Sequence, residues 1–160
     1  MARFLKKRPN KGLPPGSLVP RKPKGKKEAK ISVVNFNSEE FSERNVSVVD
    51  ECVDEAMSSD TITWINIEGL TDTKVIEDIG KKFGVSRLWL EDILNTDHRP
   101  KLDEIDDLVF IILKTVHDYD KRRKVFFEQI SLFLGENFVL SFQEYPGDVF
   151  ESVKTRLMKK

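Results

Sequence analysis

Apolar residues follow two different periods along this chain, and the period predicts which segments are strands and which are helices. Short β-branched runs at 31–36 and 46–49 predict two strands. Residues 61–67 predict a third strand, in which the alternation is imperfect, so we expect both of its faces to be covered. Toward the end of the chain, apolar runs separated by short polar turns predict an antiparallel meander. Its strands are expected at residues 108–117, 125–134 and 138–142.

Between these strands, apolar residues recur at helical spacing. Asp72 can cap one helix, and Ser86 can cap the next, which ends before Pro100 because the residue preceding a proline is biased out of helical geometry. Helices are expected at 50–57, from Thr71 or Asp72 to Gly84, from Ser86 to the residues before Arg99-Pro100, and at 148–160. This order of elements predicts an α/β (α+β) fold, in which a mixed sheet with an antiparallel C-terminal meander has helices packed on both faces.

The helix after Ser86 carries two adjacent carboxylates, Glu91 and Asp92. At about 100° per residue, its apolar residues share one sector and the two carboxylates lie on the opposite side, away from the core. That apolar sector holds Trp89, Leu90, Ile93 and Leu94. Because about 100° separates the carboxylates, they cannot easily share one ion, and each would need a partner group from another surface. The pattern suggests a metal held between subunits; a solvated helix face is the alternative.

Charge divides the chain into two parts whose totals cancel over its 160 residues. Residues 1–30 hold eleven Lys or Arg against the single Glu28, a net charge of +10, and residues 31–160 carry −10. The Lys, Pro and Gly-rich composition of the first part cannot bury a core and predicts a disordered tail. We expect residues 31–160 to form one domain. The acidic charge of that domain argues against nucleic acid as its partner.

Several other kinds of site find no support in the sequence. The lone Cys52 excludes an intramolecular disulfide and fits a reducing cytosolic setting. His98 and His117 lack the spacing of a zinc site, and the acidic run at 103–107 reads as a solvated turn. No apolar run reaches the ~18 residues of a membrane-spanning helix. Neither a Ser/His/Asp set nor a phosphate-binding loop occurs, so we do not expect an enzyme.

Several blocks, read in order and spacing, resemble the amino-terminal cytoplasmic domain of the CorA family of magnesium transporters. Trp-Ile-Asn-Ile-Glu-Gly-Leu at 64–70 and Leu-Glu-Asp-Ile-Leu-Asn at 90–95 carry much of the resemblance, which covers residues 12–19 and 31–160. The remaining blocks stand at residues 12–19, 99–101, 109–114, 128–132, 143–144 and 147–150.

The resemblance implies a fragment of a transporter at the cytoplasmic face of the cell membrane, a homo-pentamer when complete, that moves Mg²⁺ or Co²⁺. The family's long helix, its membrane helices and its Gly-Met-Asn signature would then lie outside this chain. Asp92 matches the aspartate of the family's first acidic site between cytoplasmic domains, and Glu91 the glutamate associated with a second, weaker site. Mg²⁺ bound there would be regulatory, because facing carboxylates repel one another across subunit boundaries unless a divalent ion lies between them. We expect the isolated domain to bind Mg²⁺ weakly or not at all.

Two alternatives stay open at this stage. Zinc-transporting relatives share the domain outline, and ion selectivity is expected to be set in membrane segments that this chain lacks. A regulatory or nucleic-acid-binding module that uses the basic tail is the other alternative, and it would show a salt-dependent affinity for nucleic acid that deletion of residues 1–30 abolishes.

Overall fold

A seven-stranded mixed sheet forms the centre of the molecule, with strand order β2-β1-β3-β7-β6-β5-β4. The computed structural model describes residues 12–20, 29–56, 60–118, 125–147 and 149–159. β3 and β7 run parallel, and every other neighbouring pair is antiparallel. The predicted C-terminal meander is therefore confirmed. The strands are β1 (Lys30–Phe36), β2 (Phe41–Val46), β3 (Ile62–Glu68), β4 (Lys101–Ile105), β5 (Leu108–Asp118), β6 (Val125–Leu134) and β7 (Phe138–Gln143).

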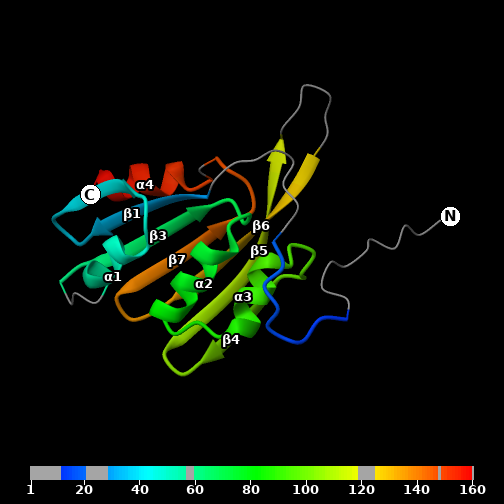
Figure 1. The fold of residues 1–160 in the computed structure, drawn as a ribbon. Helices are drawn as coiled ribbons and strands as arrows, with labels where there is room; N and C mark the ends of the chain where they lie inside the picture. The colour runs from blue at the N-terminus through cyan, green and yellow to red at the C-terminus, as the bar shows by residue number, and fades with distance from the viewer. Residues whose placement is uncertain (1–11, 21–28, 57–59, 119–124, 148, 160) are drawn as a thin grey trace.

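Helices cover both faces of this sheet, as predicted, and Figure 1 shows three of them on one face and the fourth on the other. The first face carries α1 (Asp50–Ala56), α2 (Thr73–Lys82) and α3 (Arg87–Leu94), and the second carries α4 (Glu151–Met158). On the first face Trp89 of α3 packs against Phe110 of β5, with ring centroids 5.3 Å apart. On the second face Phe150, at the start of α4, meets Trp64 of β3 edge to face at 5.2 Å. Both tryptophans are buried core residues.

Alternation along β3 explains why both of its faces are buried. Ile65 and Ile67 point to the core under α1, α2 and α3, whereas Trp64, Asn66 and Glu68 point to the side of α4. The first face is the main hydrophobic core, where Phe110 and Phe133 stack with centroids 4.3 Å apart. The second face is more polar, and its hydrogen bonds are made between neighbouring strands and to the segment that leads into α4.

Two edge strands differ from the sequence prediction. β2 spans Phe41–Val46 rather than 46–49, and β4 (Lys101–Ile105) occupies part of the run that was expected to be a solvated turn. Both strands lie at the ends of the sheet order and are largely exposed. Their polar composition follows from that position, because an edge strand with one face toward solvent keeps polar side chains. The turn itself is confined to Asp106 and Asp107, where Asp106 adopts a φ of 51°.

Helix caps fall where the sequence places them. The Asp72 carboxylate accepts hydrogen bonds from the N–H groups of Lys74 and Val75 at the start of α2, and Ser86 Oγ accepts one from Trp89 at the start of α3. α2 and α3 then pack closely at Gly80, since a Cβ built there would lie 2.4 Å from Leu90 Cδ1. This contact sets the position of α3 over the sheet.

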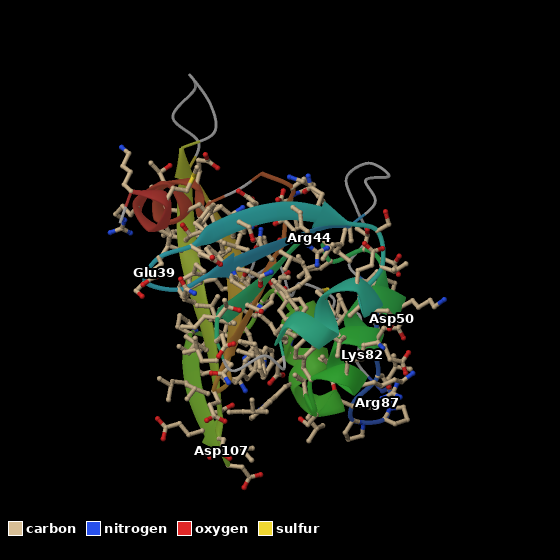
Figure 2. All side chains as sticks on the ribbon, turned by 90° about the vertical axis from the view of Figure 1, so that its left-hand side faces the viewer. Glu39, Arg44, Asp50, Lys82, Arg87 and Asp107 are labelled. Carbon is tan, nitrogen blue, oxygen red and sulfur yellow. The ribbon has the colours of Figure 1, made fainter. Side chains whose placement is uncertain are left out.

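Part of the predicted tail packs on the domain. Residues 12–20 lie beside α3, with Gly16 buried and Leu18 against the hydrophobic core. Figure 2 shows Arg87, at the start of α3, next to this segment. Residues 1–11 and 21–28, on which much of the disorder prediction rests, lie outside the described residues. The division at residue 30 therefore stays a prediction.

Candidate functional site

α3 is the element that presents the predicted site residues, and contacts with the sheet hold its C-terminal end in place. Trp89, Leu90, Ile93 and Leu94 are buried, as the helical spacing predicts. At the C-terminal end, the side-chain amide of Gln129 on β6 donates hydrogen bonds to the main-chain oxygens of Asp92 (3.1 Å) and Ile93 (3.3 Å). Lys114 Nζ, on β5, binds Thr96 O at 2.6 Å and Gln129 Oε1 at 2.9 Å. Carbonyls that a helix end leaves unpaired are thus satisfied by the sheet.

Asp92 lies at the boundary between α3 and β4, and both of its carboxylate oxygens have partners. Oδ2 accepts a hydrogen bond from Lys101 Nζ at 2.8 Å, and Oδ1 lies 2.9 Å from His98 Nε2. The side chain is 23% exposed. Asp92 therefore points away from the core, as expected, but toward two neighbouring groups of its own chain rather than into open solvent.

Lys101 is shared by two carboxylates. Besides Asp92 Oδ2, its Nζ donates to Asp103 Oδ2 at 2.6 Å, and it lies 5.0 Å from the centroid of the Phe110 ring. Lys101 and Asp103 are two residues apart on β4 and so share one face of the strand. Burial acts to lower the pKa of Lys101, but hydrogen bonds to Asp103 and Asp92 and the charges of both carboxylates outweigh it, so this pKa lies above its ordinary value. Lys101 is consequently a cation at neutral pH.

Glu91 lies on the side of α3 that faces the N-terminal segment. Its Oε2 accepts a hydrogen bond from the main-chain N–H of Gly16 at 2.7 Å. Gly16 has a φ of +79°, and a Cβ built there would lie 3.2 Å from Arg87 Cβ. The close approach of the segment to α3 thus suits glycine. Glu91 and Asp92 diverge from the helix, as predicted, and the structure does not bring them together at one point.

A Mg²⁺ ion requires hard oxygen ligands and is commonly held by one or two carboxylates together with water. Within the described residues, no group of three or more His, Cys, Asp or Glu is arranged to hold a metal. Asp92 offers one partly exposed carboxylate, and Asp103 a second that shares the same lysine. This donor set fits an ion shared with a second surface, and it does not fit an ion enclosed by one chain.

Sequence reasoning missed three partners of the site: Lys101, His98 and Gly16. Lys101 was visible only as a basic residue after the proline, and His98 only as a histidine without a zinc pattern. A signal for the Lys101 contact was the i, i+2 spacing of Lys101 and Asp103, which becomes informative once 101–105 is known to be a strand. The side chain of His117 lies outside the described residues.

Motif residues outside α3 have a structural role. Asn66 Oδ1 accepts hydrogen bonds from Ser141 Oγ and Gln143 Nε2, and Trp64 Nε1 donates to Ser141 Oγ. Gln143 and two further side chains accept hydrogen bonds from alternate N–H groups of the segment before α4. The pairs are Glu128 with Tyr145, Glu68 with Gly147 and Gln143 with Val149. These residues fix the path of the chain into α4.

The fold is shared with solved structures of other proteins. It is similar to the structure of the full-length CmaX protein, with a TM-score of 0.64 and 16% identity over 86% of this chain and 41% of that one. It is also similar to the ZntB cytoplasmic domain from Vibrio parahaemolyticus, with a TM-score of 0.57 and 14% identity over 81% of this chain and 50% of that one. None of the helices in the described part of the chain is long and apolar enough to cross a bilayer.

The sequence comparisons are more specific. Residues 59–160 match the family of CorA-like Mg²⁺ transporter proteins, and the chain belongs to this family. A curated relative, the cobalt/magnesium transport protein CorA of Thermotoga maritima, is 45% identical over 148 residues, which is 92% of this chain and 41% of the relative. The chain thus spans about two fifths of the length of that relative. The resemblance drawn from the sequence blocks is confirmed.

Proposed function

We propose that this chain is the cytoplasmic regulatory domain of a CorA-type transporter of Mg²⁺ or Co²⁺, with residues 31–160 as the domain and residues 1–30 as a basic tail. The observation that carries the proposal is membership of the CorA family over residues 59–160, together with 45% identity to a relative named for cobalt and magnesium transport. The conducting pore would lie in segments outside this chain, at the membrane whose cytoplasmic face the domain occupies. The role is regulatory and involves no enzymatic chemistry.

In this proposal, Asp92 and Glu91 are the residues that meet regulatory Mg²⁺ between protomers of a homo-pentamer. Bound there, the ion would supply positive charge between carboxylates of neighbouring protomers. Asp92 supports this role because its carboxylate is partly exposed and is held at the end of a helix that Gln129 and Lys114 fix to the sheet. Two unit charges about 4 Å apart interact by about 4 kcal/mol at an effective dielectric constant of 20, which is enough to bias the packing of protomers.

The test is Mg²⁺ inhibition of ion uptake by the transporter that carries this domain. We expect Asp92→Ala to shift the inhibition curve to higher Mg²⁺, and Glu91→Ala to shift it less. Asp107→Ala is the matched control, because it removes the same charge from the exposed β4–β5 turn, at the far end of the hairpin in Figure 2. An inhibition curve that Asp92→Ala leaves unchanged would contradict the regulatory role of this residue.

The transported ion needs its own experiment. The similarity to the ZntB cytoplasmic domain is at 14% identity and concerns the fold alone. Uptake of Mg²⁺, Co²⁺ and Zn²⁺ by the same reconstituted protein separates the two transporter assignments. Uptake of Mg²⁺ or Co²⁺ is expected, and uptake of Zn²⁺ alone would favour the zinc alternative. No nucleic-acid partner is proposed, because the domain from residue 31 onward has a net charge of −10.

A further inference from the structure

Asp92 already has a cation of its own chain at the position where a metal ligand is expected. The Lys101 ammonium lies 2.8 Å from Asp92 Oδ2, so this carboxylate is paired in the absence of any metal. A divalent ion that binds Asp92 directly must therefore compete with Lys101. Repulsion between bare carboxylates, which the simplest form of the regulatory mechanism assumes, is reduced wherever Lys101 stays on Asp92.

Lys101 also has a second carboxylate partner, Asp103. Asp103 Oδ2 lies 2.6 Å from the same Nζ, and the Phe110 ring lies 5.0 Å from it. Asp103 is on the same strand as Lys101, and Phe110 faces Asp103 across the β4–β5 pair. If Lys101 leaves Asp92, it therefore keeps a carboxylate and an aromatic face, and the cost of an unpaired ammonium does not arise.

We propose that the Lys101 ammonium competes with Mg²⁺ for the Asp92 carboxylate, and that Asp103 binds Lys101 when Mg²⁺ occupies Asp92. This inference rests on the proposed function, because it takes Asp92 as the residue that meets the ion. In this proposal, Lys101 and Asp103 have opposite effects on Mg²⁺ affinity. Lys101 raises the Mg²⁺ concentration at which the site fills, and Asp103 lowers that concentration by drawing Lys101 away.

The test is a Mg²⁺ titration of the ¹⁵N-labelled 160-residue chain by NMR, with ionic strength held constant by KCl. The readouts are the amide shifts of α3 and the side-chain ¹⁵N shift of Lys101. Mn²⁺, at low concentration, serves as a second probe, because its paramagnetic broadening shows whether the ion lies at Asp92. In the wild type we expect the Lys101 signal to move together with the α3 amides.

Lys101→Met should tighten apparent Mg²⁺ binding by about twofold to fivefold, the range that a partly exposed ion pair of up to about 1 kcal/mol allows. Lys81→Met is the matched control, since Lys81 also pairs with a carboxylate, Glu77 at 3.4 Å, but on α2. The control should leave binding at Asp92 unchanged. Lys101→Arg keeps the charge and should bind Mg²⁺ no more tightly than the wild type. If the methionine variant does not fold, Asp103→Asn on the wild-type background still tests the competition.

Asp103→Asn separates a holding role from direct ligation. On the wild-type background it should weaken Mg²⁺ binding, because Lys101 then stays on Asp92. On the Lys101→Met background it should have no effect. A further loss of binding in the double variant would mean that Asp103 is itself a ligand, and this result would overturn the proposed role of Asp103.

Two outcomes distinguish the failure of this inference from the failure of the proposed function. If Asp92→Asn abolishes Mg²⁺ binding while Lys101→Met leaves it at the wild-type value, Lys101 is not a competitor, although Asp92 remains a ligand. If the wild-type chain shows Mg²⁺-dependent shifts and Mn²⁺ broadening at α3, and Asp92→Asn changes neither of them, Asp92 is not a ligand, and both ideas fail together.

Discussion

The main-chain N–H of Gly16 donates a hydrogen bond to the Glu91 carboxylate at 2.7 Å, across 75 positions of the sequence. This contact attaches the N-terminal segment to the helix that carries both predicted metal ligands. The neighbouring carboxylate, Asp92, is bound by Lys101 at 2.8 Å. Both acidic residues of α3 thus take part in the folded structure of a single chain, and any metal that binds them acts on contacts that already exist.

The Gly16 contact predicts a strong effect of one methyl group. Gly16→Ala should lower the free energy of unfolding by about 1–2 kcal/mol through its left-handed φ of +79°, and by more through the contact of its Cβ with Arg87 Cβ at 3.2 Å. It should also expose the residue-16 amide to exchange. Urea unfolding and NMR hydrogen exchange measure the two effects. Gly12→Ala is the control, because Gly12 has a similar φ of +91° but nothing within 4 Å of a built Cβ. Equal losses for the two variants would show that the contact with Arg87 is unimportant.

The packing of α2 against α3 predicts a non-additive pair. Gly80→Ala should destabilise the protein by about 1–3 kcal/mol, because the new Cβ would lie 2.4 Å from Leu90 Cδ1 in a fully buried contact. Leu90→Ala removes the side chain in the way and leaves a cavity. The double variant should therefore lose less unfolding free energy than the two single variants lose in sum, as measured by thermal or urea unfolding. Strict additivity would contradict the proposed clash.

The segment before α4 should loosen when its acceptors are removed. Glu68 Oε2 accepts a hydrogen bond from the Gly147 N–H at 3.0 Å, and the Glu68 side chain is only 4% exposed. Glu68→Ala should cost about 1–3 kcal/mol and speed exchange of the Gly147 amide, because the N–H loses a buried acceptor. Glu68→Gln keeps an acceptor oxygen and should retain most of the protection. If both variants behave alike, the carboxylate oxygen is not what holds this segment.

The ion pair between α4 and β2 should respond unequally to the loss of each partner. Lys154 Nζ pairs with Glu43 Oε1, and the side chains are 3% and 37% exposed. Glu43→Ala removes this partner of the buried Lys154 ammonium, so it should lower the free energy of unfolding by about 1–3 kcal/mol. Lys154→Met leaves a carboxylate that water can reach and fills the same space, so it should cost less than about 1 kcal/mol. A larger loss of unfolding free energy for Lys154→Met than for Glu43→Ala would contradict this interpretation.

Much of the fold follows from local patterns in the sequence. Asp72 and Ser86 cap helices because their side chains reach N–H groups within three residues, and that geometry depends on local sequence alone. The apolar runs of β5, β6 and β7 predict strands because both of their faces carry apolar or half-buried residues. The same argument fails for β2 and β4, whose position at the edges allows polar residues that resemble loops.

Residue spacing is enough to predict the helix that carries Glu91 and Asp92 and to separate these carboxylates from the apolar side of α3. The contacts that each carboxylate makes depend on how distant segments pack. Lys101 reaches Asp92 because β4 forms the edge of the sheet beside α3, and Gly16 reaches Glu91 across 75 positions. Residue identity sets charge and hydrogen-bonding capacity, but the partner of each charged group depends on distances that arise only when the chain folds.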